Sequence, residues 1–195
     1  MTSMLIRYLL VSFTLMMWIS ITAQKTPEIY QYRIRVLYED RIVQAEIKPV
    51  KRMKDLNFNL RYAWYASNQI NFTQGGFSGK LLNGYYSEYY RSKSLRAQGS
   101  YSEGLKDGTW KAWDEKGNLI ERLGWKNGLR NGVFQTFDTV GKIKEEGTYK
   151  KDLLHGALKK YKGDSLEVIL YKDGSPSQGN VRSGFLYNLF KARHI

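Results

Sequence analysis

The sequence predicts an all-β protein: an elongated single-layer antiparallel sheet of tandem β-hairpins with a 24-residue period, capped at its N-terminal end by a further hairpin. Three observations predict this fold. The glycines Gly84, Gly108, Gly132 and Gly156 follow one another at intervals of 24 residues. Large apolar side chains recur at fixed distances from these glycines, and short aromatic and β-branched runs alternate with turn-forming residues. A fixed period of this length is typical of proteins built from stacked repeats.

Each 24-residue unit has the pattern of one hairpin. Between Gly108 and Gly132, an aromatic run at 109–113 is followed by the polar stretch 114–118 and a second apolar run at 119–125. Such runs bounded by Gly, Asn and Asp indicate strands and turns. Gly84, Gly108 and Gly132 each follow Asn or Asp, so we expect turns at these glycines and a positive φ at one or both residues of each pair. A helix is disfavoured because every unit contains two or more glycines.

Aromatic residues hold the positions two, five and seventeen residues after Gly84, Gly108 and Gly132, whereas Leu158 and Tyr161 stand two and five residues after Gly156. Residues three apart in a regular strand face opposite sides, so one face of a single layer needs a cover. The N-terminal hairpin, the C-terminal tail, a twist of the array or a partner could provide it. One hypothesis makes these aromatics the core between repeats; the other leaves one row open as a platform for a glycan, a peptide or a protein. The candidate residues are Tyr86, Tyr89, Tyr101, Trp110, Trp113, Trp125, Phe134, Phe137, Tyr149 and Tyr161.

The segment 24–59 precedes the repeats and is expected to cap them. Residues 30–38 alternate between apolar and polar, Glu39 and Asp40 indicate a turn, and residues 41–47 alternate again. Pro49 ends the second strand because it has no N–H to donate. We therefore expect a hairpin over 28–48, followed by the repeat array over 60–178.

The two ends of the array are less regular than its middle. Tyr62 and Tyr65 lie 24 residues before Tyr86 and Tyr89, which indicates a degenerate first repeat. The last unit, from Gly156, is frayed. The tail 179–195 is aromatic and lacks acidic residues, so it either docks on the last repeat as a cap or remains free for a partner.

Residues 1–23 have the pattern of a secretory signal peptide. One basic residue precedes an apolar run over 8–21, and Ala23 offers a cleavage point. Retention of this segment as a membrane anchor is the alternative, although the run is shorter than a typical span. The chain has no Cys, so disulfides and thiolate chemistry are excluded. We expect export to the periplasm, the cell envelope or the medium.

The charge and the sparse chemistry of the chain favour binding over catalysis. The formal net charge is +13, spread along the chain, and it either attracts anionic lipid and acidic polymers or solvates strand edges. Nucleic acid is disfavoured as a partner of an exported protein. Of the two His residues, His155 holds a turn position, and Glu145 and Glu146 are neighbours that point to opposite faces of a strand. We expect no catalytic site, no metal and no cofactor.

The segments 101–113, 125–137 and 149–161 resemble MORN-type repeats, with Tyr or Trp, two glycines and further aromatics in order. In the third segment Asp152 replaces the first of the two glycines. The resemblance implies a single-layer sheet of hairpins. Bacterial members are often labelled antitoxin-like, and eukaryotic members are linked to membranes and protein scaffolds. We expect a non-enzymatic scaffold that binds an envelope protein; the alternatives are a surface for glycan or anionic lipid and an antitoxin-like binding protein.

Overall fold

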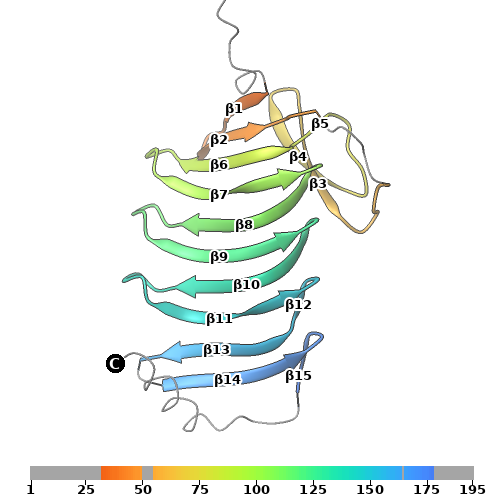
Figure 1. The fold of residues 1–195 in the computed structure, drawn as a ribbon. Coiled ribbons are helices and arrows are strands. Elements are labelled where there is room, and N and C mark those ends of the chain that lie inside the picture. The colour runs from red at the N-terminus through yellow and green to blue at the C-terminus, as the bar shows by residue number, and fades with distance from the viewer. Residues whose placement is uncertain (1–31, 50–54, 164, 178–195) are drawn as a thin grey trace, which may run out of the picture. The chain divides into compact units, whose positions relative to one another are not determined.

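A computed structural model describes residues 32–49, 55–163 and 165–177 of the protein. These residues form strands and no helix, and most of the strands belong to a 12-stranded antiparallel sheet, here called the repeat sheet (Figure 1). Its order is β1-β2-β6-β7-β8-β9-β10-β11-β13-β14-β15, and β12 pairs with β11. The strands are β1 (Arg33–Leu37), β2 (Arg41–Glu46), β6 (Gly84–Tyr90), β7 (Leu95–Ser102), β8 (Leu105–Trp113), β9 (Leu119–Lys126), β10 (Leu129–Phe137), β11 (Ile143–Lys150), β12 (Leu153–Leu154), β13 (Gly156–Lys162), β14 (Ser165–Lys172) and β15 (Ser175–Pro176).

The tandem hairpins predicted by the 24-residue period are confirmed. At one margin of the repeat sheet, two-residue turns at 103–104, 127–128, 151–152 and 173–174 have positive φ at both residues. This geometry matches the natural twist of antiparallel strands. At the other margin, longer loops follow β6, β8 and β10; in the second of these, the Asp114 carboxylate accepts a hydrogen bond from the Asn118 N–H at 2.8 Å.

The four periodic glycines do have positive φ, but their expected place in turns is corrected by the structure. Gly108 and Gly132 lie inside β8 and β10, with φ of 73° and 98°. Between Arg130 and Phe134 the pairing of β10 with β9 shifts register, so Gly132 belongs to a bulge. A bulge and a hairpin turn both favour Gly after Asn or Asp, so local sequence does not separate them.

The expected N-terminal hairpin forms one end of the repeat sheet. β1 pairs with β2 from Arg33↔Glu46 to Leu37↔Ile42, and β2 pairs with β6. Val36, Val43 and Ala45 are buried, as the alternating pattern predicts. β2 therefore occupies the edge of β6 that a preceding repeat would need.

Residues 60–83, expected to be a first repeat of the same array, form a second sheet instead. This small sheet has the order β4-β3-β5, with β3 (Arg61–Ala66), β4 (Gln69–Gln74) and β5 (Lys80–Leu81). Two backbone hydrogen bonds tie it to the β7–β8 turn: the Ala63 N–H donates to the Gly104 carbonyl, and the Gly104 N–H donates to the Leu82 carbonyl. Within the segment, the Leu82 N–H donates to the Ala63 carbonyl. Because β2 already pairs with that edge of β6, the β3–β4 hairpin lies outside the repeat sheet.

Two clusters of buried side chains lie along the repeat sheet. The first combines Val43, Ala45, Tyr86, Tyr101 and Trp110 with Ala63 of the small sheet. The second is built from repeat-sheet residues, centred on Leu123, Phe134 and Leu158. The small sheet thus supplies part of the cover that aromatic rows require, a source that the sequence did not indicate.

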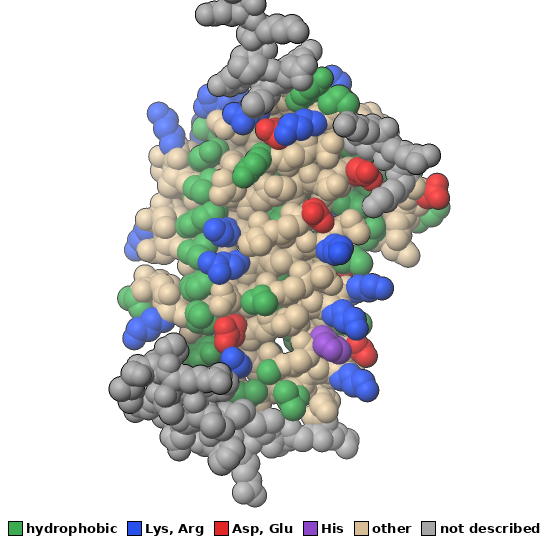
Figure 2. Space-filling model, viewed as in Figure 1, with side chains coloured by type: hydrophobic (Ala, Val, Ile, Leu, Met, Phe, Trp, Pro, Cys, Tyr) green, Lys and Arg blue, Asp and Glu red, His purple; other side chains and the backbone are tan. Residues whose placement is uncertain are grey.

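Hydrophobic and basic side chains are arranged differently on the face drawn in Figure 2. Hydrophobic side chains form a column along the repeat sheet, and Lys and Arg side chains lie mainly toward its two margins.

The chain divides into two units, residues 1–31 and 32–195. The expected signal peptide at 1–23 and the expected tail at 179–195 lie outside the described residues. Among the residues that are described, none belongs to a helix with the length and hydrophobicity needed to cross a membrane.

Candidate functional site

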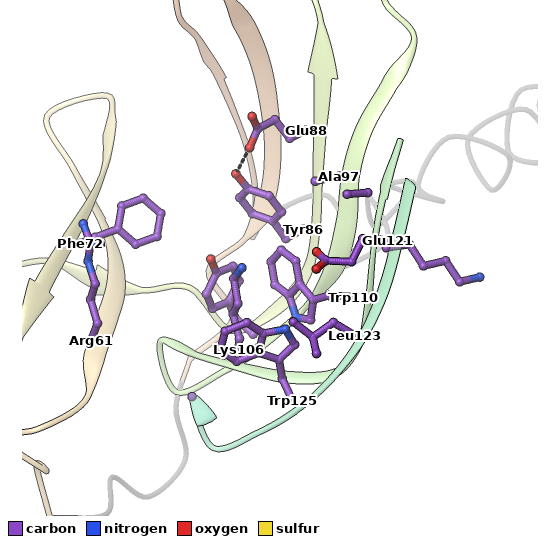
Figure 3. A pocket seen from close by; sticks show the side chains of 14 residues that line it. Arg61, Phe72, Tyr86, Glu88, Ala97, Lys106, Trp110, Glu121, Leu123 and Trp125 are labelled. Carbon is purple, nitrogen blue, oxygen red and sulfur yellow. Dashed lines mark hydrogen bonds between the residues drawn. The ribbon is translucent and has the colours of Figure 1, made fainter. Parts of the chain in front are cut away.

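A groove of about 490 Å³ lies between the small sheet and the repeat sheet. Arg61 and Phe72 of the small sheet line one side, and Tyr86, Lys106 and Trp110 of the repeat sheet line the other (Figure 3). The remaining lining residues are Glu88, Ala97, Tyr101, Lys111, Ala112, Glu121, Leu123, Trp125 and Gly128.

Three aromatic rings form the floor of the groove. The centroids of Tyr86, Tyr101 and Trp110 lie 5.1 to 5.5 Å from one another. The Trp110 indole N–H donates to the Ser100 carbonyl at 3.1 Å. Trp110 lies so close to Gly99 that a Cβ there would stand 2.3 Å from the indole ring, so the absent side chain of Gly99 makes room for the ring. This packing fixes the indole in place.

Small side chains keep the groove open between two carboxylates. Strand register places Glu88 opposite Ala97, Ala97 opposite Ala112, and Ala112 opposite Glu121. At ordinary strand spacing, two carboxylates three strands apart are separated by roughly 14 Å. The two alanines between them leave space above the sheet for a ligand.

Glu88 is neutralised by its neighbours. Its carboxylate lies 3.2 Å from Arg96 Nη1 and 3.7 Å from Arg41 Nε, and it accepts a hydrogen bond from the Tyr86 hydroxyl at 2.8 Å. Burial, together with this adjacent carboxylate, raises the pKa of Tyr86, so the phenol stays protonated. Tyr86 therefore acts as a donor and packing group.

Lys106 extends over the aromatic floor. Its ammonium lies 4.2 Å from the Trp110 ring centroid and 4.8 Å from that of Trp125. Burial lowers the pKa of Lys106, against the opposing influence of Glu121 and Glu88. Within the described part of the chain, Lys106 has no carboxylate oxygen within 4.0 Å of its ammonium. On the opposite side of the groove, the Arg61 guanidinium lies 5.3 Å from the Phe72 ring centroid.

The structure brings four of the ten predicted aromatics into the groove: Tyr86, Tyr101, Trp110 and Trp125. The other six lie elsewhere. Phe134 and Tyr149 pack together in the second cluster, with centroids 4.9 Å apart, and the Tyr161 hydroxyl donates to Glu146. Tyr89, Trp113 and Phe137 are half-buried.

Sequence reasoning missed Arg61, Phe72, Glu88 and Lys106. For Lys106 a signal was present, because the position two residues before each periodic glycine holds Leu82, Lys106, Arg130 and Leu154 in turn. Arg61 and Phe72 belong to the small sheet, whose position no repeat position encodes, and Glu88 lies on β6, where the repeat pattern singled out the aromatics.

Comparison with known families identifies the central units. The model of the MORN repeat variant matches residues 106–127 and 130–151, which cover β8–β9 and β10–β11. Two tandem units of the chain thus match the MORN repeat variant. Among curated proteins, no sequence matches the chain. MORN-variant repeats form a repeat and binding family rather than a typically enzymatic one.

The chemistry of the groove suits noncovalent recognition. Its aromatic floor, fixed donor groups and charged side chains are the features of a binding pocket. The described residues contain no group of three or more His, Asp or Glu side chains that could hold a metal ion. His155 lies away from the groove, with its Nδ1 3.3 Å from Asp173.

Proposed function

We propose that this MORN-variant repeat protein is a non-enzymatic scaffold of the bacterial envelope, and that it binds a partner protein in the groove between its two sheets. The observation that carries the proposal is the aromatic floor of Tyr86, Tyr101 and Trp110 in a groove of about 490 Å³. Aromatic side chains in a pocket rimmed by charges are the usual anchors of protein interfaces.

Export is the second part of the proposal. It rests on the signal-peptide pattern of residues 1–23 and on the absence of Cys. N-terminal sequencing of the protein from fractionated cells tests it, with a mature N-terminus near Gln24 expected. An intact Met1 in the membrane fraction would contradict cleavage and favour an anchor.

Site-specific photo-crosslinking in cells tests the groove. Phe72, which is exposed and lines the groove, is replaced by a benzoyl-phenylalanine; the matched control places the same group at Tyr85. Tyr85 is the strand neighbour of Tyr86 and therefore points to the other face. We expect a discrete protein adduct from position 72 and none from position 85.

A groove-filling variant gives the second control. Ala112→Phe fills the space between the carboxylates, whereas Thr109→Phe adds the same ring at an exposed position of the same strand. The adduct should disappear with Ala112→Phe and persist with Thr109→Phe. Adducts that form equally from both faces, or that survive the filled groove, would contradict this site. An antitoxin-like role would also give a protein adduct, whereas a glycan or lipid surface would give none.

A further inference from the structure

We propose that the groove recognises an acidic strand segment of its partner, with a carboxylate of that segment bound to Lys106. This inference rests on the proposed function and specifies the chemistry of the ligand. It is carried by a comparison between two equivalent repeats of the same chain.

The two MORN-variant repeats contain the same pair of positions. The Gly128 N–H donates to the Lys106 carbonyl at 2.9 Å, and 24 residues later the Asp152 N–H donates to the Arg130 carbonyl at 2.9 Å. Lys106 and Arg130 are thus structurally equivalent, as are Gly128 and Asp152. Each cation also stacks on an aromatic ring nineteen residues ahead in the sequence.

In the second repeat the cation has an internal carboxylate. Asp152 Oδ1 lies 3.0 Å from Arg130 Nε and 2.8 Å from the Arg130 backbone N, while the guanidinium lies 4.3 Å from the Tyr149 ring centroid. The ion pair and the ring contact together compensate the charge. In this repeat, the position for a carboxylate that pairs with the cation is that of the Asp152 side chain.

In the first repeat that carboxylate is absent. Gly128 stands where Asp152 stands, and within the described residues Lys106 makes no ion pair within 4.0 Å. Lys106 is more enclosed than an ordinary surface lysine, and Glu121 and Glu88 only partly offset the unfavourable burial of its charge. A ligand carboxylate at the position that Gly128 leaves open would complete the pair.

The other charges of the groove are consistent with an acidic ligand. Glu88 is held by Arg96 and Arg41 and does not repel strongly. Arg61 adds a second cation from the small sheet. Glu121, at the far end of the alanine row, acts electrostatically on Lys106 and favours a neutral or basic ligand side chain beside it.

Among the described strands, β4 has one edge that no strand pairs with, and this edge favours a peptide over a sugar acid or a lipid. Ala63 uses its N–H and carbonyl to bond Gly104 and Leu82, so it does not bond Phe72, its partner across β3–β4. The Phe72 N–H and carbonyl therefore point to the open edge of β4, where the neighbouring Ile70 N–H already bonds the Tyr38 hydroxyl at 2.9 Å. Only a peptide offers the alternating donors and acceptors that pair with such an edge.

The test uses two pools of bead-bound, acetylated and amidated heptapeptides. Both pools have random strand-forming residues at six positions; one has Glu at the centre and the other has Gln. Polygalacturonate beads and phosphatidylglycerol vesicles serve as the sugar-acid and lipid probes. The full-length protein should be retained on the Glu pool about tenfold more than on the Gln pool, and more than on either other probe.

Four variants of the protein separate the carboxylate site from general charge. Lys106→Met should reduce the Glu-to-Gln ratio to about one, whereas Lys144→Met, which removes an exposed lysine elsewhere, should leave it unchanged. Gly128→Asp installs the carboxylate of the other repeat and should also abolish the preference. Gly128→Asn has nearly the same size and should preserve it. Asp152 occupies the equivalent turn position with φ +69°. A Cβ at Gly128 would meet Leu105 Cδ2 at 3.0 Å, so both variants require a small shift of that side chain, and comparing Asp with Asn keeps this cost the same.

The outcomes distinguish this inference from the proposed function. Equal retention of the two pools, with both lost in Ala112→Phe, would overturn acidic recognition and keep protein binding in the groove. Retention on polygalacturonate or on vesicles without a Glu preference would overturn the peptide. If neither pool is retained although the crosslink at position 72 forms, the inference fails alone; if that crosslink is also absent, both proposals fail.

Discussion

The two halves of the repeat sheet bury equivalent aromatics in different ways. Trp110 on β8 packs with Tyr86 and Tyr101 in a cluster that includes Ala63 of the small sheet. Phe134 on β10 holds the same repeat position and is equally buried, but the members of its cluster all come from the repeat sheet. The two repeats also differ in how their cation is paired, because Arg130 forms an ion pair with Asp152 and Lys106 has Gly128 at the equivalent position. One repeat holds its cation in an internal ion pair, while in the other Lys106 lines the groove with no carboxylate oxygen of the described residues within 4.0 Å.

The largest effect expected is the loss of the Trp110 ring. Trp110→Ala should destabilise the protein by about 3–5 kcal/mol, because Trp110 is 7% exposed and joins both sheets through one cluster. Trp113→Ala, at a half-buried position of the same strand, should cost clearly less. Urea denaturation measures both. Similar losses for the two variants would contradict the assignment of Trp110 to the core, and lost partner binding with unchanged stability would favour an open platform.

Acid should weaken the end of the repeat sheet next to the small sheet. Glu46 is 3% exposed, and this burial raises the pKa of its carboxyl group. Hydrogen bonds from Lys48 Nζ at 2.7 Å and from the Tyr85 N–H at 3.1 Å lower the pKa by more. The net pKa of Glu46 therefore lies below the usual 4.5. A depressed carboxyl pKa stabilises the fold above the unfolded-state value, and this stability is lost as the pH falls through the folded-state value.

The Glu46→Gln variant isolates this contribution. Hydrogen bonds to a charged group contribute about 1.5–3 kcal/mol, so between neutral pH and values below 4.5 the native protein should lose that much more stability than the variant. Urea denaturation across pH provides the measurement. Parallel stability curves for the two proteins would assign the acid sensitivity to other carboxylates.

Substitution of Gly132, the glycine of the β10 bulge, tests whether the loss of stability remains confined to the neighbouring repeats. Gly132 has φ +98°, and a Cβ there would meet no atom within 4 Å, so Gly132→Val reports backbone strain rather than a clash. We expect a loss of about 1–2 kcal/mol or more, against little for Lys126→Val at an exposed strand end. Hydrogen exchange should show lost protection centred on β9–β11. Uniform loss over all strands would mean that the sheet unfolds as one cooperative unit.

The regular elements of the fold could be predicted because they repeat or alternate. The period gave the hairpins, and the apolar alternation before Pro49 gave the β1–β2 hairpin with its turn at Glu39 and Asp40. The bulges were misplaced because Asn-Gly suits both a bulge and a turn. The small sheet was unpredictable because its position depends on the long-range hydrogen bonds of Ala63 with Gly104 and Leu82.

The same contrast applies to the candidate site. Its aromatic floor follows from the repeat, so Tyr86, Tyr101 and Trp110 were among the predicted residues. Arg61 became a site residue only because the small sheet lies along one side of the groove, whereas Lys106 lies at a repeat position whose significance was not recognised. Asp152 was visible as an exception to the repeat, but its meaning required the ion pair with Arg130.

The smallest expected effect concerns that ion pair. Asp152→Asn keeps an oxygen that can accept from the Arg130 backbone N–H but removes the charge facing the guanidinium. Both side chains are about 40% exposed, so we expect a loss below about 1 kcal/mol that diminishes further in high salt. The same substitution in an Arg130→Met background should have no such salt-dependent effect, and the difference between the backgrounds measures the pair. A loss that is equal in both backgrounds would come from the turn itself. In that case Asp152 would be conformational rather than a counter-ion, and the contrast between Arg130 and Lys106 would lose its electrostatic basis.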